Sequence, residues 1–170
     1  SVLLKPKTTD QLSEIMALCF EYDQPVVIQG GLTGLAGGAT PLVGELAISL
    51  ERMRGIETID PSGMTLTALA GTPLQVLQDA ADDHNLSLPL DLGARGSCQI
   101  GGNVSTNAGG TEVIRYGMTR EWVKGMKVVT GGGELLDLNR GLNKNATGYD
   151  FRHLFTGAEG TLGFIVELTV

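Results

Sequence analysis

Three glycine-rich segments beside short apolar runs constrain this sequence more than any other feature. The first, GGLTGLAGG, fills residues 30–38, one residue after the apolar run VVI, and the other two fill residues 93–110 and 157–163. Glycine lets a ligand approach the backbone closely, and successive N–H groups in such turns form concave anion-binding sites. Tight turns would explain any one segment alone. With 25 glycines in 170 residues, about twice the ordinary usage of ~7%, the chain favours a surface for a large anionic ligand.

The first segment indicates how such a ligand would be held. Residues 25–50 contain no Lys or Arg, so a phosphate bound there would depend on backbone amides and the Thr33 hydroxyl. The common phosphate-binding motifs are absent from the sequence: it has neither G-x-G-x-x-G nor G-x-x-x-x-G-K-[ST]. A Rossmann dinucleotide site and a P-loop are therefore both poor interpretations of these glycines.

The hydrophobic pattern predicts an α+β fold rather than a doubly wound α/β fold, because β-hairpins are interleaved with a few helices and no regular βαβ alternation is seen. A soft boundary near residues 51–56 would separate a βαββ subdomain, residues 1–55, from a larger, mainly antiparallel subdomain, residues 56–170. Thr8 and Gln11 have capping-box spacing at the start of the first helix, and Thr72 is predicted to cap a second helix with Pro73 in its first position. The predicted elements are helices over 8–22 and 150–155, strands over 25–29, 45–50 and 164–170, hairpins over 55–70 and 123–138, and a long irregular stretch over 86–117.

Composition and charge exclude several classes of function. The formal net charge of −7, with no basic cluster, argues against nucleic-acid and anionic-membrane surfaces. The sequence has no run of about 18 apolar residues. Cys19 and Cys98 make no disulfide framework, which favours a reducing, cytoplasmic compartment. His84 and His153 lack metal-ligand neighbours, so no metal site is expected. The chain does not begin with Met and stops inside a strand pattern, so we expect it to be part of a longer protein.

Taken in order, the three segments resemble one family. PVVIQGGLTGLAGGATP, LPLDLGARGSCQIGGNVSTNAGG with RYG just after it, and GYDFRHLFTGAEGTLG are similar to the FAD-binding domain of FAD-linked oxidases, the vanillyl-alcohol-oxidase or PCMH-type fold. The resemblance covers essentially the whole chain. Within that family the sequence looks most like the group of D-2-hydroxyglutarate dehydrogenases, D-lactate dehydrogenases and the flavin subunit of glycolate oxidase.

The resemblance implies FAD held between two α+β subdomains. Residues 30–35 would wrap the pyrophosphate with backbone amides, residues 89–110 would run along the pyrophosphate, ribityl chain and flavin ring, and residues 159–166 would close over the adenosine half. The first loop has no His of the kind that attaches flavin covalently in some relatives, so FAD is expected to be non-covalent. Leu32 stands where many relatives carry a polar residue such as Asn, which puts one hydrogen bond to the cofactor in doubt. The cofactor-binding residues implied are Gly30, Gly31, Leu32, Thr33, Gly34, Leu35, Pro89, Asp91, Gly93, Ala94, Ser97, Cys98, Gly101, Gly102, Asn103, Thr106, Asn107, Gly109, Gly110, Glu159, Gly160, Gly163, Ile165 and Val166.

The resemblance also implies a reaction. In relatives of this kind the flavin accepts the α-hydrogen of a 2-hydroxy acid as hydride, a base removes the hydroxyl proton, and cationic groups bind the carboxylate. Those groups, and often a metal, come largely from a C-terminal substrate domain that residues 1–170 do not include, so we expect FAD binding here without a complete catalytic site. Arg115 and Tyr116 could lie near the flavin or be structural, and Glu159 could bind ligand hydroxyls or sit in a solvated turn. The alternative is a stand-alone FAD or nucleotide-binding module that serves a partner subunit.

Overall fold

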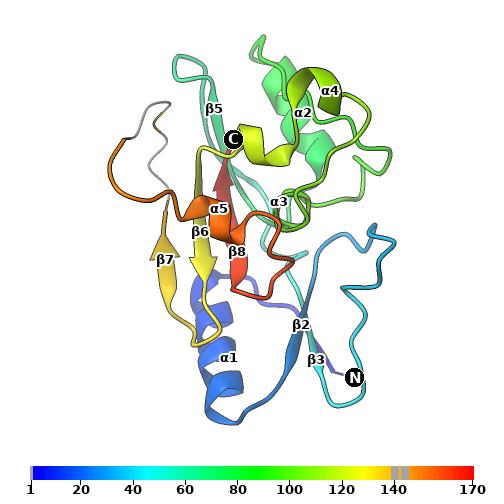
Figure 1. Ribbon diagram of the computed structural model, residues 1–170, viewed down its shortest axis with the longest axis vertical. Helices are drawn as coiled ribbons and strands as arrows, with labels where there is room; N and C mark the ends of the chain where they lie inside the picture. Colours follow the sequence, from blue (N-terminus) through cyan, green and yellow to red (C-terminus); the bar gives the residue numbers. More distant parts are fainter. Residues whose placement is uncertain (1, 139–141, 143–145) are drawn as a thin grey trace.

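The computed structural model describes residues 2–138, 142 and 146–170. These residues form two β-sheets with helices packed against them (Figure 1). The first sheet has three parallel strands in the order β1-β3-β2. The expected strands at 25–29 and 45–50 are confirmed as its two longer members. The bounds are β1 Leu3–Leu4, α1 Thr9–Glu21, β2 Val26–Gln29 and β3 Leu46–Ser49.

The second sheet has five antiparallel strands in the order β4-β5-β8-β6-β7. Its two outer pairs are the hairpins expected from the sequence, and the last strand of the chain, β8, lies between them. Five of the six residues of β8 are buried, which agrees with its nearly continuous apolar sequence because a central strand is covered on both faces. The bounds are β4 Ile56–Asp60, β5 Thr65–Leu69, β6 Gly125–Val129, β7 Leu135–Asp137 and β8 Phe164–Thr169.

One hydrophobic core joins the two sheets. Helix α1 belongs in sequence to the first sheet, yet it contacts β6 of the second, and its residues Leu12 and Met16 pack in the same core cluster as Ile48 of β3 and Leu168 of β8. The Thr8 hydroxyl accepts a hydrogen bond from the N–H of Gln11 (3.2 Å), which confirms the predicted start of α1. The division of the chain into subdomains at residue 55 stays a prediction, because the sheets are separate but the core is continuous.

Two expectations about the middle of the chain are wrong. Thr72 does not cap α2 (Leu74–Asp82); Pro73 is the N-cap, and the Thr72 hydroxyl instead donates to the carbonyls of Leu69 and Gly55. The stretch 86–117 is not irregular throughout, because it contains α3 (Ile100–Ser105) and α4 (Val113–Tyr116). The remaining elements are the 3₁₀ helix η1 (Thr119–Trp122) and α5 (Arg152–Phe155), and the latter lies within the helix expected over 150–155.

Helix α3 forms although two of its six residues are glycine, a poor helix former. A Cβ on Gly101 would lie 2.6 Å from the Cβ of Ala70, at the end of β5, so only glycine allows the helix to pack this closely. The N–H of Gly101 donates to the Ala70 carbonyl (2.9 Å), and α3 contacts β8. Tertiary packing therefore decides this helix and fixes where its polar side chains point.

Candidate functional site

The loop after β2 presents a row of unused backbone donors. Among the described residues, none accepts a hydrogen bond from the N–H groups of residues 31–38. Residues 32–38 are exposed, and the loop extends to one side of the first sheet (Figure 1). Successive free N–H groups of this kind bind anions without any basic side chain. The loop is therefore able to hold a phosphate with backbone alone.

This loop forms one wall of a cavity of about 390 Å³. The cavity is also lined by residues of α3, by residues 92–94, by Ile28 and Gln29 of β2 and by Ile165 of β8. Gly34, Gly93 and Gly102 face open space, with no heavy atom within 4 Å of the position that a Cβ would occupy. A side chain at these positions would enter space that is now free, so the glycines leave room for a ligand against the main chain.

Two side-chain amides in this cavity have atoms without a strong hydrogen-bond partner. Gln99 is 8% exposed and Asn103 is 5% exposed; within the described part of the chain Gln99 Oε1 has no partner, and Asn103 Nδ2 has none beyond the weakly accepting sulfur of Cys98. Buried polar groups are nearly always hydrogen-bonded, so a pair without strong partners in a cavity indicates that a ligand supplies the missing bonds.

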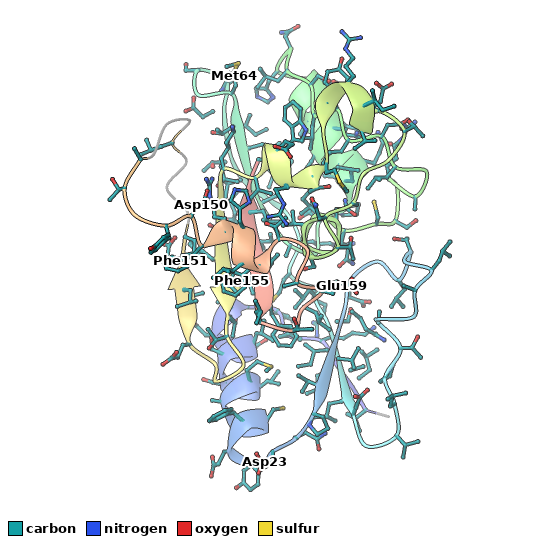
Figure 2. All side chains as sticks on the ribbon, in the orientation of Figure 1. Asp23, Met64, Asp150, Phe151, Phe155 and Glu159 are labelled. Carbon is teal, nitrogen blue, oxygen red and sulfur yellow. The ribbon has the colours of Figure 1, made fainter. Side chains whose placement is uncertain are left out.

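A second cavity of about 340 Å³ continues from the first. The two cavities share Ile28, Gly38 and Glu159, and the second extends between β2 and residues 160–164. Glu159 lies between α5 and β2 in Figure 2 and is, among the residues that the structure describes, the one charged residue that lines either cavity. Its φ of 53° is in the left-handed region, which side chains other than glycine rarely adopt. A double cavity with so few charged groups suits a long ligand that is recognised mainly by backbone and amide groups.

The second and third glycine-rich segments are tied together beside these cavities. The N–H of Glu159 donates to the Ser105 carbonyl (2.8 Å), and the N–H of Gly157 donates to the Val104 carbonyl (3.0 Å). Arg120 adds a side-chain bridge: its Nη2 donates to the Thr156 carbonyl (2.7 Å), and its Nη1 contacts His153 Nδ1 (2.9 Å). A guanidinium only donates, so His153 Nδ1 must accept. Arg120 therefore holds Glu159 and its neighbours against the end of α3.

Removing this bridge should loosen the cavity wall. We expect Arg120→Met to lower the free energy of unfolding by about 2 kcal/mol, because charge-assisted hydrogen bonds to partly buried carbonyls are lost. Arg115 provides a matched control, since it is exposed and lies over the Tyr116 ring at 5.0 Å. Arg115→Met should change stability by less than about 0.5 kcal/mol. Urea denaturation of the two variants measures the difference, and equal stabilities would show that Arg120 holds nothing.

The structure brings together many of the residues implied by the resemblance and leaves others outside. Three of those outside both cavities have protein partners instead: Asn107 Oδ1 accepts from the Arg120 N–H, Asp91 accepts from the Thr111 hydroxyl, and Val166 is in the core. The larger cavity is lined by Gly30, Gly31, Leu32, Thr33, Gly34, Gly93, Ala94, Cys98, Gly101, Gly102, Asn103, Thr106, Glu159 and Ile165; the smaller by Glu159, Gly160 and Gly163; and neither by Leu35, Pro89, Asp91, Ser97, Asn107, Gly109, Gly110 and Val166.

Sequence reasoning missed several lining residues, of which Gln99 is the most informative. A single polar residue before an apolar one gives no pattern, so nothing in the sequence distinguished Gln99 from a surface residue. The small residues at the end of the first loop could have been included, because the glycine-rich sequence continues there as GLAGGA. Also missed were Ile28, Gln29, Ala36, Gly37, Gly38, Ala39, Leu50, Ala70, Leu92, Ser105 and Ala108.

Cys98 lines the cavity but is poorly suited to react. The thiol is buried, and burial raises its pKa, so it is a neutral thiol rather than a thiolate at neutral pH. Within the described ranges, no group of three His, Cys, Asp or Glu residues could hold a metal ion. No helix in the part of the chain that the structure describes is long and apolar enough to cross a membrane.

Comparison with solved structures identifies the fold. A structure of alkyldihydroxyacetonephosphate synthase superposes with a TM-score of 0.86 over 98% of this chain and 30% of that one, at 23% sequence identity. The protein therefore has the PCMH-type FAD-binding fold, which confirms the α+β expectation. The profile of the FAD binding domain family matches residues 1–139, and the chain belongs to that family.

Curated relatives are named for one activity. D-2-hydroxyglutarate dehydrogenase of Xanthomonas citri pv. viticola is 52% identical over 165 residues, which are 97% of this chain and 35% of that protein. A mitochondrial D-2-hydroxyglutarate dehydrogenase of Danio rerio is 45% identical over 99% of this chain and 32% of its own length. The chain thus spans about a third of the length of these relatives.

The site fits the cofactor that the family name implies. FAD has an anionic pyrophosphate between two long polar halves, and the structure offers free N–H groups, open-faced glycines and unpartnered buried amides along two joined cavities. Because no Lys or Arg of the described ranges lines either cavity, the fit rests on backbone and amide hydrogen bonds.

Proposed function

We propose that this chain is the FAD-binding part of a flavin-dependent oxidoreductase that oxidises a D-2-hydroxy acid to the 2-oxo acid. The observation that carries the proposal is the row of free N–H groups over residues 31–38 beside two joined cavities, in a chain 52% identical to a D-2-hydroxyglutarate dehydrogenase. The substrate is proposed to be of the 2-hydroxyglutarate, lactate or glycolate type. The electron acceptor is left open.

The proposal assigns a role to each group of cavity residues. Residues 31–38 hold the pyrophosphate through main-chain N–H groups, and the larger cavity takes the flavin half. Residues 159–163 line the smaller cavity and close over the adenosine half, where Glu159 is placed to accept hydrogen bonds from ribose hydroxyls. Ile28, Leu50 and Ile165 give the larger cavity an apolar lining that excludes water. Bound FAD would supply the hydride-accepting chemistry.

The proposal also covers the remaining catalytic groups, the attachment of FAD and the location of the protein. The catalytic base, the groups that bind the substrate carboxylate and any metal are proposed to come from a further domain. FAD is proposed to be non-covalent, because the first loop has no His and the Cys98 thiol is neutral. We propose a cytoplasmic location, with any membrane association made through the electron acceptor. Several relatives are named mitochondrial, so the location stays a proposal.

The visible spectrum of the purified full-length protein tests the proposal. We expect flavin absorption bands, and bleaching of these bands when a D-2-hydroxy acid is added without oxygen. The matching L-2-hydroxy acids serve as controls and should leave the bands unchanged. Flavin that no D-2-hydroxy acid bleaches would favour the alternative, a stand-alone FAD-binding module serving a partner subunit. Colourless protein whose melting temperature FAD does not raise would overturn both.

A further inference from the structure

We propose that Gln99 and Asn103 form a buried amide pair reserved for hydrogen bonds to FAD. The same two side chains would then tighten cofactor binding and lower the stability of the cofactor-free protein. This inference rests on the proposed FAD binding. It adds Gln99 to Asn103, which the resemblance already implies as a cofactor contact, and it assigns the pair an effect on the stability of the cofactor-free protein.

The two amides lie on one face of one element. Gln99 is the N-cap of α3 and Asn103 is four residues on, and the Asn103 N–H donates to the Gln99 carbonyl (3.0 Å). Residues four apart on a helix are neighbours on its surface. Gln99 Oε1 faces the first loop, 3.7 Å from the position that a Cβ on Gly30 would occupy. The Cα of Gly102 lies at the same distance from that position. The pair therefore stands where the first and second glycine-rich segments meet.

The absence of partners is selective. Among the described residues, Gln99 Oε1 and Asn103 Nδ2 are the side-chain nitrogen and oxygen atoms that are fully buried without a strong partner, and both belong to residues lining the larger cavity. Other buried polar side chains are satisfied: Thr72, Thr119 and Thr156 each donate to a backbone carbonyl. Two exceptions about one helical turn apart, at residues lining one cavity, indicate a common missing partner.

The chemistry of the pair defines what it would bind. An amide carries no charge and offers both donors and an acceptor, so the pair suits an oxygen-rich ligand with several hydrogen-bonding groups and does not suit an apolar one. In FAD such groups occur in the pyrophosphate and in the ribityl chain with the polar edge of the flavin ring. Without the ligand, the unpaired buried atoms destabilise the fold.

Isosteric apolar substitutions separate the two effects. We expect Gln99→Met and Asn103→Leu each to raise the dissociation constant for FAD about tenfold, since a hydrogen bond to a buried group is lost. The same variants should raise the melting temperature of the cofactor-free protein by several degrees and shrink the further rise caused by FAD. Flavin fluorescence titration and thermal denaturation of the purified protein give both quantities. If either residue only supported the fold, its substitution would lower the melting temperature of the cofactor-free protein as well as weaken FAD binding.

Fragments of the cofactor show which half the amides contact. Weaker binding of ADP to the variants assigns them to the pyrophosphate side, and weaker binding of riboflavin with unchanged ADP binding assigns them to the flavin side. Either result supports the pair as a cofactor contact.

Gln78 supplies a control with a satisfied amide. Its Nε2 donates to the carbonyls of Leu88 (3.1 Å) and Leu90 (2.8 Å), and it lines neither cavity. Gln78→Met should lower the melting temperature, opposite in sign to the other two variants. The inference is overturned if both cavity variants keep the FAD affinity of the wild type, or if their cofactor-free forms melt at a lower temperature. The proposed function stands in either case, provided that the wild type binds FAD. Failure of the wild type to bind FAD would instead overturn the proposed function itself.

Discussion

Gly34→Val should yield a protein that folds like the wild type but is purified without flavin. No heavy atom lies within 4 Å of the position of a Cβ on Gly34, so a valine has space in the cofactor-free fold. Gly34 lines the larger cavity inside the row of free N–H groups. A branched side chain there would keep the pyrophosphate from reaching the backbone donors. We expect the dissociation constant for FAD to rise at least about a hundredfold, or roughly 2.7 kcal/mol.

Gly31→Val should fail differently, although both glycines belong to the same loop. A Cβ on Gly31 would lie 2.9 Å from the carbonyl carbon of Ser97, which leaves no room even for alanine. This substitution separates the first two glycine-rich segments, so stability and FAD affinity should fall together. Circular dichroism melting and flavin absorbance, measured on both variants, distinguish the two cases. If Gly34→Val protein keeps its yellow colour, the free N–H row does not hold the cofactor.

Features determined by local sequence could be predicted, and those determined by distant contacts could not. The cap at Thr8 and the apolar stripe of Leu12 and Met16 are both local, and α1 is confirmed. Helix α3 was missed because its stability comes from the close contact of Gly101 with Ala70, thirty-one residues earlier in the chain. The Thr72 hydroxyl had the right spacing for a cap but bonds Gly55 instead, a partner that spacing cannot reveal.

The candidate site was predictable to the extent that backbone forms it. Glycine runs indicate accessible backbone, so the sequence alone could predict that the first loop, Gly93 and Gly102 line a ligand cavity. Polar side chains were less informative, because loop residues such as Asp91 and Asn107 bond to neighbouring segments as readily as to a ligand. Leu32 shows a further limit: its φ of 56° is a left-handed conformation that a leucine gives no reason to expect. Asn, the residue that the family resemblance leads us to expect there, tolerates this conformation better.

Gly133→Val should weaken FAD binding although Gly133 lines neither cavity. Gly133 lies in the turn between β6 and β7, with φ of 84°, and a Cβ there would lie 2.9 Å from the Ala17 N and 3.1 Å from the Ala17 Cβ in α1. The left-handed backbone and the overpacking against α1 together should lower the free energy of unfolding by roughly 2–5 kcal/mol. Helix α1 leads directly into β2, and β2 ends at the first loop. Pushing α1 away from β6 therefore displaces the loop that holds the pyrophosphate.

The neighbouring glycine tests whether this coupling is specific. The nearest heavy atom to a Cβ on Gly132 is Thr130 Oγ1 at 4.0 Å, so Gly132→Val places the same side chain one residue away in open space. We expect Gly132→Val to leave the urea midpoint and FAD affinity near wild type, and Gly133→Val to lower both. If Gly133→Val lowers stability but leaves FAD affinity unchanged, the two sheets are positioned independently of α1. One core cluster contains residues of α1, β3 and β8, and this core fixes the position of the two sheets relative to each other. Because both sheets contribute residues to the cavity, we expect stability and FAD affinity to fall together.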